Sequence, residues 1–150
     1  MKKLAILLLL PTLYAADEGK RPRILGDAHM ALFVSDLAKA RAFYDSVLGA
    51  LGYKRLKDLG DRGSIWGESA EEFFILTPAD GKPATNANGG TVSFVAPSRA
   101  AVAAFHRAAL AAGGKDEGAV GPRGFWPNAY AGYVRDLDGN KLAAYCTKPE

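Results

Sequence analysis

Two segments of this chain repeat one pattern, and this repeat constrains the fold more than any other feature. The first covers residues 29–52 (HMALFVSDLAKARAFYDSVLGALG) and the second covers residues 91–114 (TVSFVAPSRAAVAAFHRAALAAGG). Each begins with a short apolar run typical of a buried strand. Each then continues with apolar residues spaced three and four apart, as in an amphipathic helix, and ends in glycine. The repeat therefore predicts two copies of one strand-plus-helix unit.

The residues that follow each unit predict three further strands per copy. After the first helix, three short strand candidates separated by glycine and acidic turns lie at 53–59, 64–66 and 73–77. After the second helix, a weak strand candidate lies near Ala119, and the runs 130–136 and 141–147 form a hairpin across the turn Leu137-Asp138-Gly139-Asn140. Each half is therefore predicted to be βαβββ.

The boundaries follow from composition. Residues 78–90 are rich in Pro, Gly and Asn and are predicted to link module 1 (27–77) to module 2 (91–147). Together these form a single domain over residues 27–147, preceded by a polar lead-in at 16–26. The chain is 49% hydrophobic, which is sufficient for a buried core.

The amino terminus has the order of a secretory signal peptide. Lys2 and Lys3 precede an apolar run at 4–10, and the small residues Ala15 and Ala16 follow. The run is too short for a spanning helix, so we expect residues 1–15 to be a cleaved leader and the protein to be periplasmic or extracellular. An N-terminal anchor or a buried helix is the alternative.

Charge and cysteine content exclude several classes of partner. Removal of the leader takes away two lysines and lowers the formal net charge from +3 to +1, and no basic stripe with interleaved aromatic residues remains. We therefore expect no nucleic-acid partner. Cys146 is the only cysteine. It lies in an apolar run, where a buried side chain is expected, and no cysteine near the leader provides a lipid anchor, so no stable membrane anchor is expected.

Three segments, 29–53, 91–114 and 128–146, together resemble the vicinal oxygen chelate superfamily. This superfamily includes glyoxalase I, bleomycin-resistance proteins and extradiol dioxygenases, and the similarity is strongest to small glyoxalase-like bacterial members. The resemblance implies an α+β fold in which two βαβββ modules form paired curved mixed sheets around a central pocket. In active enzymes of the family, that pocket holds a divalent metal.

The resemblance also implies a degenerate metal site. Similar chains supply a histidine from the first strand, here His29, a second histidine at the position of Thr91, and a glutamate at the position of Ala143. A single imidazole with a hydroxyl and a methyl group is a poor ligand set for a divalent ion, so we expect a remnant site without a cofactor. If unrecognised residues complete the site, zinc, nickel, iron or manganese is the expected metal.

Other titratable residues have simpler interpretations than metal ligation. His106 is expected on a solvated or boundary face of the second helix. Glu71 and Glu72 form a charged turn before a strand, and Asp136 and Asp138 shape the hairpin turn.

The candidate ligand-binding residues lie mainly between the second helix and the terminal hairpin. Arg123, Trp126 and Tyr130 fall in the segment GPRGFWPNAY, and similar proteins carry an arginine and tyrosines near the pocket mouth. Together with His29 and Trp66, they form the predicted site, in which an arginine flanked by aromatic rings binds a planar anion such as a carboxylate. The alternative is an ordinary loop anchored by buried Trp126 and Tyr130, with Trp66 packed in the core.

Two functional hypotheses follow, and a third concerns assembly. The first is an exported protein with an impaired metal site that binds a small organic ligand. The second is a metal-dependent lyase or dioxygenase that uses His29 and unrecognised ligands. The third is a role in assembly alone. Such modules pair within one chain or by exchange with a second copy, and we expect a homodimer.

Overall fold

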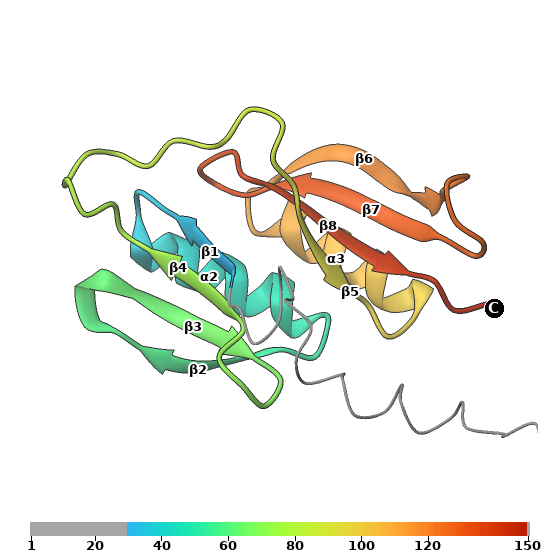
Figure 1. The fold of residues 1–150 in the computed structure, drawn as a ribbon, viewed down its shortest axis with the longest axis horizontal. Coiled ribbons are helices and arrows are strands. Elements are labelled where there is room, and N and C mark those ends of the chain that lie inside the picture. Colours follow the sequence, from blue (N-terminus) through green and yellow to red (C-terminus); the bar gives the residue numbers. More distant parts are fainter. Residues whose placement is uncertain (1–29, 150) are drawn as a thin grey trace, which may run out of the picture.

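The computed structural model describes residues 30–149, and both halves of this range contain the same series of elements (Figure 1). The first half contains β1 (Met30–Phe33), α2 (Leu37–Gly49), β2 (Lys54–Asp58), the 3-10 turn η1 (Gly60–Arg62), β3 (Gly63–Gly67) and β4 (Phe73–Leu76). The second contains β5 (Val92–Val95), α3 (Arg99–Ala111), β6 (Lys115–Pro122), β7 (Tyr130–Arg135) and β8 (Lys141–Cys146). The predicted βαβββ order is confirmed in both. The predicted leader, the lead-in and His29 lie outside the described residues.

Each half forms a four-stranded mixed sheet with the same topology. The strand orders are β1-β4-β3-β2 and β5-β8-β7-β6. In each sheet the first strand pairs in parallel with the last, and the other neighbours are antiparallel. The register is equivalent as well, because Ala31 pairs with Phe74 as Ser93 pairs with Ala143. The α+β class and the two-module architecture are therefore confirmed.

Side-chain caps and left-handed glycines set the helix ends. Asp36 accepts a hydrogen bond from the backbone N–H of Lys39 at the start of α2, and Ser98 accepts one from Ala101 at the start of α3. Gly52 and Gly113 follow the helices with φ angles of 96° and 93°, which only glycine adopts readily. Both helices thus begin after a side-chain cap and end before a glycine of the repeated segments.

The strand β6 differs most from expectation. The sequence indicated only a weak strand near Ala119, but β6 runs for 8 residues and pairs with β7 from Lys115 opposite Arg135 to Pro122 opposite Tyr130. Its residues, KDEGAVGP, include few of the β-branched and aromatic types that favour strands. Pairing with β7, rather than intrinsic propensity, holds this segment extended.

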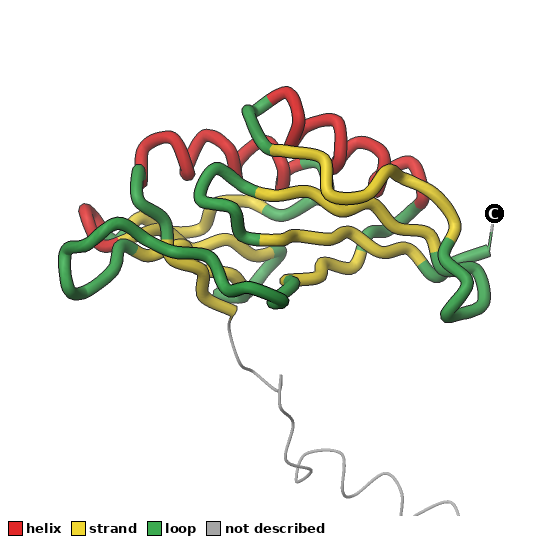
Figure 2. The backbone as a smooth tube through the Cα atoms, turned by 90° about the horizontal axis from the view of Figure 1, so that it is seen from above, coloured by secondary structure: helices red, strands yellow, loops and turns green. Residues whose placement is uncertain are grey.

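Both helices lie on one side of the strands, and no helix of residues 30–149 covers the other side (Figure 2). The core lies between the helices and the sheets, and a single cluster of buried side chains joins both modules. We refer to the side of the sheets away from the helices as the open face. Within residues 30–149, no helix is long and apolar enough to span a membrane.

Aromatic rings and one buried carboxylate join the two modules. The ring of Phe94, from β5, lies 5.3 Å from that of Phe73 and 6.2 Å from that of Tyr53, centroid to centroid. The side chain of Asp136 is buried and accepts hydrogen bonds from the hydroxyl of Tyr44, at 2.5 Å, and from the backbone N–H of Asn140, at 2.7 Å. Asp136 thus shapes the hairpin turn, as expected, and also connects it to the first module.

Candidate ligand-binding site

Two tyrosines on the open face of the second sheet define the candidate site. Tyr133 of β7 pairs with Ala143, and Tyr145 of β8 pairs with Ala131, so the two side chains are diagonal neighbours on one face. Their rings lie 5.8 Å apart at 89°, and their hydroxyls form a short hydrogen bond with each other. Burial first, and then the hydrogen bond with Tyr133, raises the pKa of Tyr145 to about 12. The phenol of Tyr145 is therefore neutral at physiological pH.

Two cations lie over the ring of Tyr133. The guanidinium carbon of Arg123 is 5.2 Å from the ring centroid, and the ammonium nitrogen of Lys141 is 5.1 Å from it. The guanidinium of Arg123 donates to the carbonyl oxygens of Ala119, at 2.6 Å, and Pro122, at 3.2 Å. These bonds fix the orientation of the predicted anion-binding arginine at the edge of the open face.

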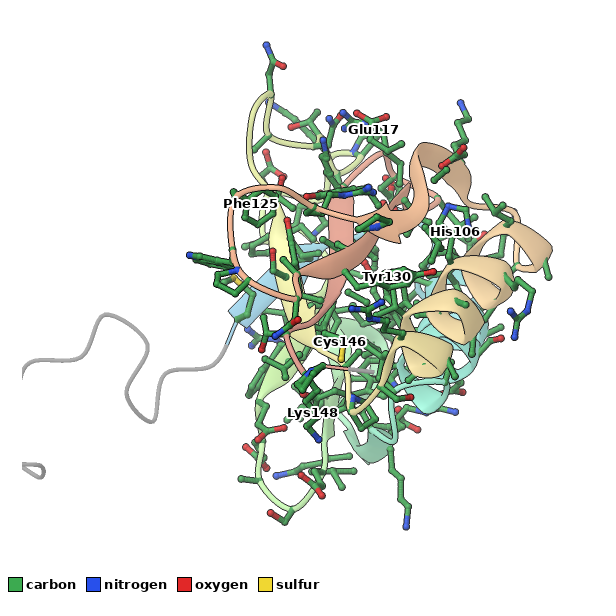
Figure 3. All side chains as sticks on the ribbon, turned by 90° about the vertical axis from the view of Figure 1, so that its right-hand side faces the viewer. His106, Glu117, Phe125, Tyr130, Cys146 and Lys148 are labelled. Carbon is green, nitrogen blue, oxygen red and sulfur yellow. The ribbon has the colours of Figure 1, made fainter. Side chains whose placement is uncertain are left out.

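A loop between β6 and β7 adds exposed aromatic side chains to the site. The backbone N–H of Arg123 donates to the carbonyl of Ala129 across this loop, and Asn128 adopts a left-handed φ of 59°. The rings of Phe125 and Trp126 lie 5.4 Å apart, nearly perpendicular, and Figure 3 shows Phe125 on the side away from the helices. The loop is therefore held closed at its base while its two aromatic residues remain accessible.

These aromatic residues line a cavity of about 330 Å³ on the open face. Its walls are mostly apolar, and three of the lining residues carry hydroxyl groups. The lining residues are Ser93, Phe94, Val95, Phe125, Trp126, Tyr145 and Thr147. Tyr145 connects the cavity to the tyrosine pair, because its ring also lies 6.1 Å from that of Phe125. The arrangement combines an apolar compartment with a polar, positively charged end, as small-molecule sites commonly do.

The structure corrects the sequence interpretation of two tryptophans. Trp126 is 61% exposed, so the alternative in which it is buried to anchor the loop is wrong. Trp66 has no exposed surface, and its indole N–H donates to Asp45 at 3.1 Å on the helix side of the first sheet. Trp66 therefore packs in the core and does not line the cavity.

Tyr130 also lies away from the predicted position. The guanidinium carbon of Arg99, at the start of α3, is 5.1 Å from the Tyr130 ring, and this half-buried ring packs against the core (Figure 3). Tyr130 and Tyr133 are three positions apart in β7, so their side chains point to opposite faces. Tyr133 therefore belongs to the open face and Tyr130 does not. The alternation of side chains along a strand was the sequence signal for this difference, and the sequence interpretation missed it.

The described residues offer a poor fit to a divalent metal. Thr91 is exposed just before β5, and Ala143 is fully buried between its pairing partners Ser93 and Tyr133. The equivalent position of the first sheet is Phe74. From residue 30 to residue 149, no group of three or more His, Cys, Asp or Glu side chains is placed to bind a metal ion.

His106 is more buried than the sequence indicated. It is 9% exposed, and its Nε2 lies 3.0 Å from a carboxylate oxygen of Asp116 on β6. The hydrogen bond with His106 is the main cause of a lowered pKa of Asp116. The expectation of a solvated or boundary face is therefore wrong, because β6 covers this side of α3 more completely than a weak strand would.

The remaining candidates have structural partners. Glu71 lies 3.9 Å from the ammonium of Lys57, and Glu72 accepts a hydrogen bond from the backbone N–H of Glu68 at 3.2 Å. Both contacts agree with the interpretation of a charged turn. Cys146 is buried, as expected of a small apolar side chain.

Comparisons with known proteins identify the family. Residues 28–144 match the family model of the glyoxalase/bleomycin resistance protein/dioxygenase superfamily. The chain belongs to this superfamily. Comparison with curated proteins gave no match.

Several solved structures have a fold similar to that of this chain. A glyoxalase/bleomycin resistance protein from Albidiferax ferrireducens is 37% identical, with a TM-score of 0.72 over 81% of this chain and 98% of that one. A lactoylglutathione lyase from Agrobacterium tumefaciens is 25% identical, with a TM-score of 0.56 over 81% and 94% of the two chains. A fosfomycin resistance protein from Listeria monocytogenes shares the fold at 17% identity, with a TM-score of 0.61 over 84% and 96%.

Proposed function

We propose that this chain is an exported glyoxalase-like protein with a degenerate metal site, which binds a small organic ligand in the cavity on its open face. The observation that carries this proposal is the exposed apolar surface at the cavity. Val95 is 78% exposed, Trp126 61% and Phe125 54%, although each has a large apolar side chain. A ligand seated there would cover this surface, and such clustered exposure commonly marks a binding site.

The chemistry around the expected metal position supports binding without a metal. Thr91 and Lys141 line the same cavity of about 220 Å³ between the two modules. A protonated ammonium at this position repels a divalent cation, and neither Thr91 nor Ala143 supplies the nitrogen or carboxylate ligands that such ions prefer.

Export is proposed from the sequence of residues 1–15 alone. Lys2, Lys3 and the apolar run at 4–10 have the order of a leader. Fractionation of cells that express the full chain, with mass spectrometry of the product, tests this. Recovery of the uncleaved chain in the cytosol would contradict it.

Ligand binding is tested with a panel of planar aromatic compounds. We expect saturable binding of 2-naphthoate or its neutral amide, 2-naphthamide, by calorimetry, and at least tenfold weaker binding in Trp126→Ala because the main wall of the cavity is removed. Leu110→Ser is the matched control, because Leu110 is 41% exposed but lies on α3, on the opposite side of the sheet. Absence of saturable binding by either compound would contradict the proposal.

A metal-dependent lyase is the second candidate. It is favoured by the 25% identity to a lactoylglutathione lyase and by His29, which immediately precedes β1. Elemental analysis of the purified protein, followed by titration with zinc, nickel, iron(II) and manganese, tests it. Stoichiometric metal that is lost in His29→Ala would favour the enzyme, whereas equal metal content in the two proteins would contradict metal ligation by His29.

A further inference from the structure

We propose that the open-face cavity selects flat aromatic carboxylates, with the ring against Phe125 and Trp126 and the carboxylate against Arg123 and the Tyr133–Tyr145 hydroxyl pair. This inference rests on the proposed function and narrows it to one class of ligand. It is carried by three independent features of the site, namely a free hydroxyl proton, an arginine with no acidic partner among residues 30–149, and an angular aromatic wall.

The tyrosine pair has one hydrogen-bond donor to spare. When two hydroxyls bond to each other, one donates and the other accepts, so the proton of the accepting hydroxyl remains available. Within residues 30–149, neither hydroxyl bonds to a third group. Because Tyr145 also lines the cavity, a ligand oxygen in the cavity is a suitable acceptor for this proton.

Arg123 supplies positive charge that no carboxylate of the described residues neutralises. Two of its five N–H donors bind the backbone carbonyls of Ala119 and Pro122, and the other donors are free to bind a ligand. In the described part of the chain, no carboxylate pairs with Arg123.

Lys141, the other cation over the Tyr133 ring, does have an acidic partner. Lys141 lies 3.8 Å from a carboxylate oxygen of Glu117, which also binds Arg135 at 2.6 Å. Glu117 is shared between two cations, so Lys141 and Arg135 together keep one positive charge beside it. Arg123 has no carboxylate partner within residues 30–149 and also acts electrostatically on Tyr145. Its guanidinium is therefore the group best placed to bind a ligand anion, and a carboxylate matches its forked geometry.

The apolar wall has a shape suited to a ring. The planes of Phe125 and Trp126 meet at 72°, and the Phe125 and Tyr145 planes meet at 63°. A flat ring in this angle stacks on one side chain while its edge meets another, which is the geometry that aromatic groups prefer. The polar end then lies at Tyr145, so ring and carboxylate are positioned by different parts of the site.

Calorimetry with three related compounds tests the proposal. At pH 7, we expect 2-naphthoate to bind at least tenfold more tightly than 2-naphthamide and more tightly than 2-naphthyl phosphate. Arg123→Gln is expected to reduce the affinity for 2-naphthoate to about that for the amide, and Tyr145→Phe to reduce it about tenfold, because each loses a hydrogen bond to a charged group. Arg107→Gln, on the outer side of α3, removes an equal charge and is expected to leave affinity unchanged.

The outcomes separate this inference from the proposed function. Equal binding of the acid and the amide by the parent protein, a measurement that requires no variant, would overturn selectivity for anions and leave ligand binding intact. Tighter binding of the phosphate would overturn the assignment to carboxylates. Failure of all three compounds to bind would overturn both proposals together.

Discussion

The phenol oxygen of Tyr44 lies 2.5 Å from a carboxylate oxygen of Asp136, and this buried hydrogen bond joins α2 of the first module to the β7–β8 turn of the second. Tyr44 has no exposed surface and Asp136 is only 4% exposed, so the bond lies away from solvent. The two modules are therefore connected through a specific polar contact inside a mostly apolar core.

Tyr44→Phe is expected to lower the free energy of unfolding by about 1.5–3 kcal/mol, because a buried carboxylate loses a hydrogen-bond donor. Urea denaturation measures this. Tyr53→Phe, which removes a hydroxyl from a half-buried tyrosine in the same module, is the control. Equal effects of the two substitutions would contradict a specific role for the contact.

Two glycine substitutions are expected to have opposite effects. A Cβ atom at Gly67 would lie 1.7 Å from the carbonyl oxygen of Ala70, so Gly67→Ala must displace the backbone there. We expect it to lower the free energy of unfolding by about 1–3 kcal/mol. Gly49 lies in α2, and a Cβ atom added there would meet no neighbouring atom within 4 Å. Gly49→Ala should therefore raise the free energy of unfolding by about 0.5–1 kcal/mol, because alanine favours the helix more than glycine does. Thermal denaturation of the two variants tests the pair, and a stabilising Gly67→Ala would refute the close approach.

The titration of Tyr145 reports on the geometry of the site. Its pKa of about 12 is raised by burial and then by the hydrogen bond with Tyr133, whereas Arg123 opposes the shift. Tyr133→Phe should therefore lower this pKa, and Arg123→Gln should raise it. Spectrophotometric titration of the phenols between pH 9 and 13 measures both. A change in the same direction in the two variants would contradict the arrangement.

The contact between His106 and Asp116 should make the free energy of unfolding depend on pH in the acid range. The pKa of Asp116 is lowered in the folded state, mainly by this hydrogen bond. Ionised Asp116 therefore adds to the free energy of unfolding above its ordinary pKa of 3.8. This stabilisation is lost as the pH falls through the lower pKa of the folded state. Parent and Asp116→Asn should therefore differ in their free energy of unfolding above pH 3.8, and the difference should shrink as the pH falls below it. Asp61→Asn, an exposed substitution, is the control, and a difference that does not shrink on acidification would contradict this assignment.

The two tryptophans should respond differently to a soluble quencher. Trp126 is 61% exposed and Trp66 is fully buried. Acrylamide is expected to quench the emission of the parent protein substantially, and the remaining emission of Trp126→Phe should be blue-shifted and resistant. Quenching that is unchanged in Trp126→Phe would place Trp126 inside the protein.

Sequence by itself determined the module architecture. The repeat, the helix caps at Asp36 and Ser98, and the glycines after each helix are local signals, because caps and turns depend on residues close together in the chain. The hairpin turn around Asp136 and Gly139 was equally local. The resemblance that named the family rested on the same segments.

Tertiary structure decided which side chains meet. Strand pairing held β6 extended although its own residues favour a strand weakly, and that strand in turn covered His106. The open-face site depends on the register of β7 against β8, which brings Tyr133 and Tyr145 together while Tyr130 points to the helices. The position of a strand's side chains changes face with each residue, so a site assembled across two strands is specified by register and packing over the whole sheet, and no single segment of sequence contains it.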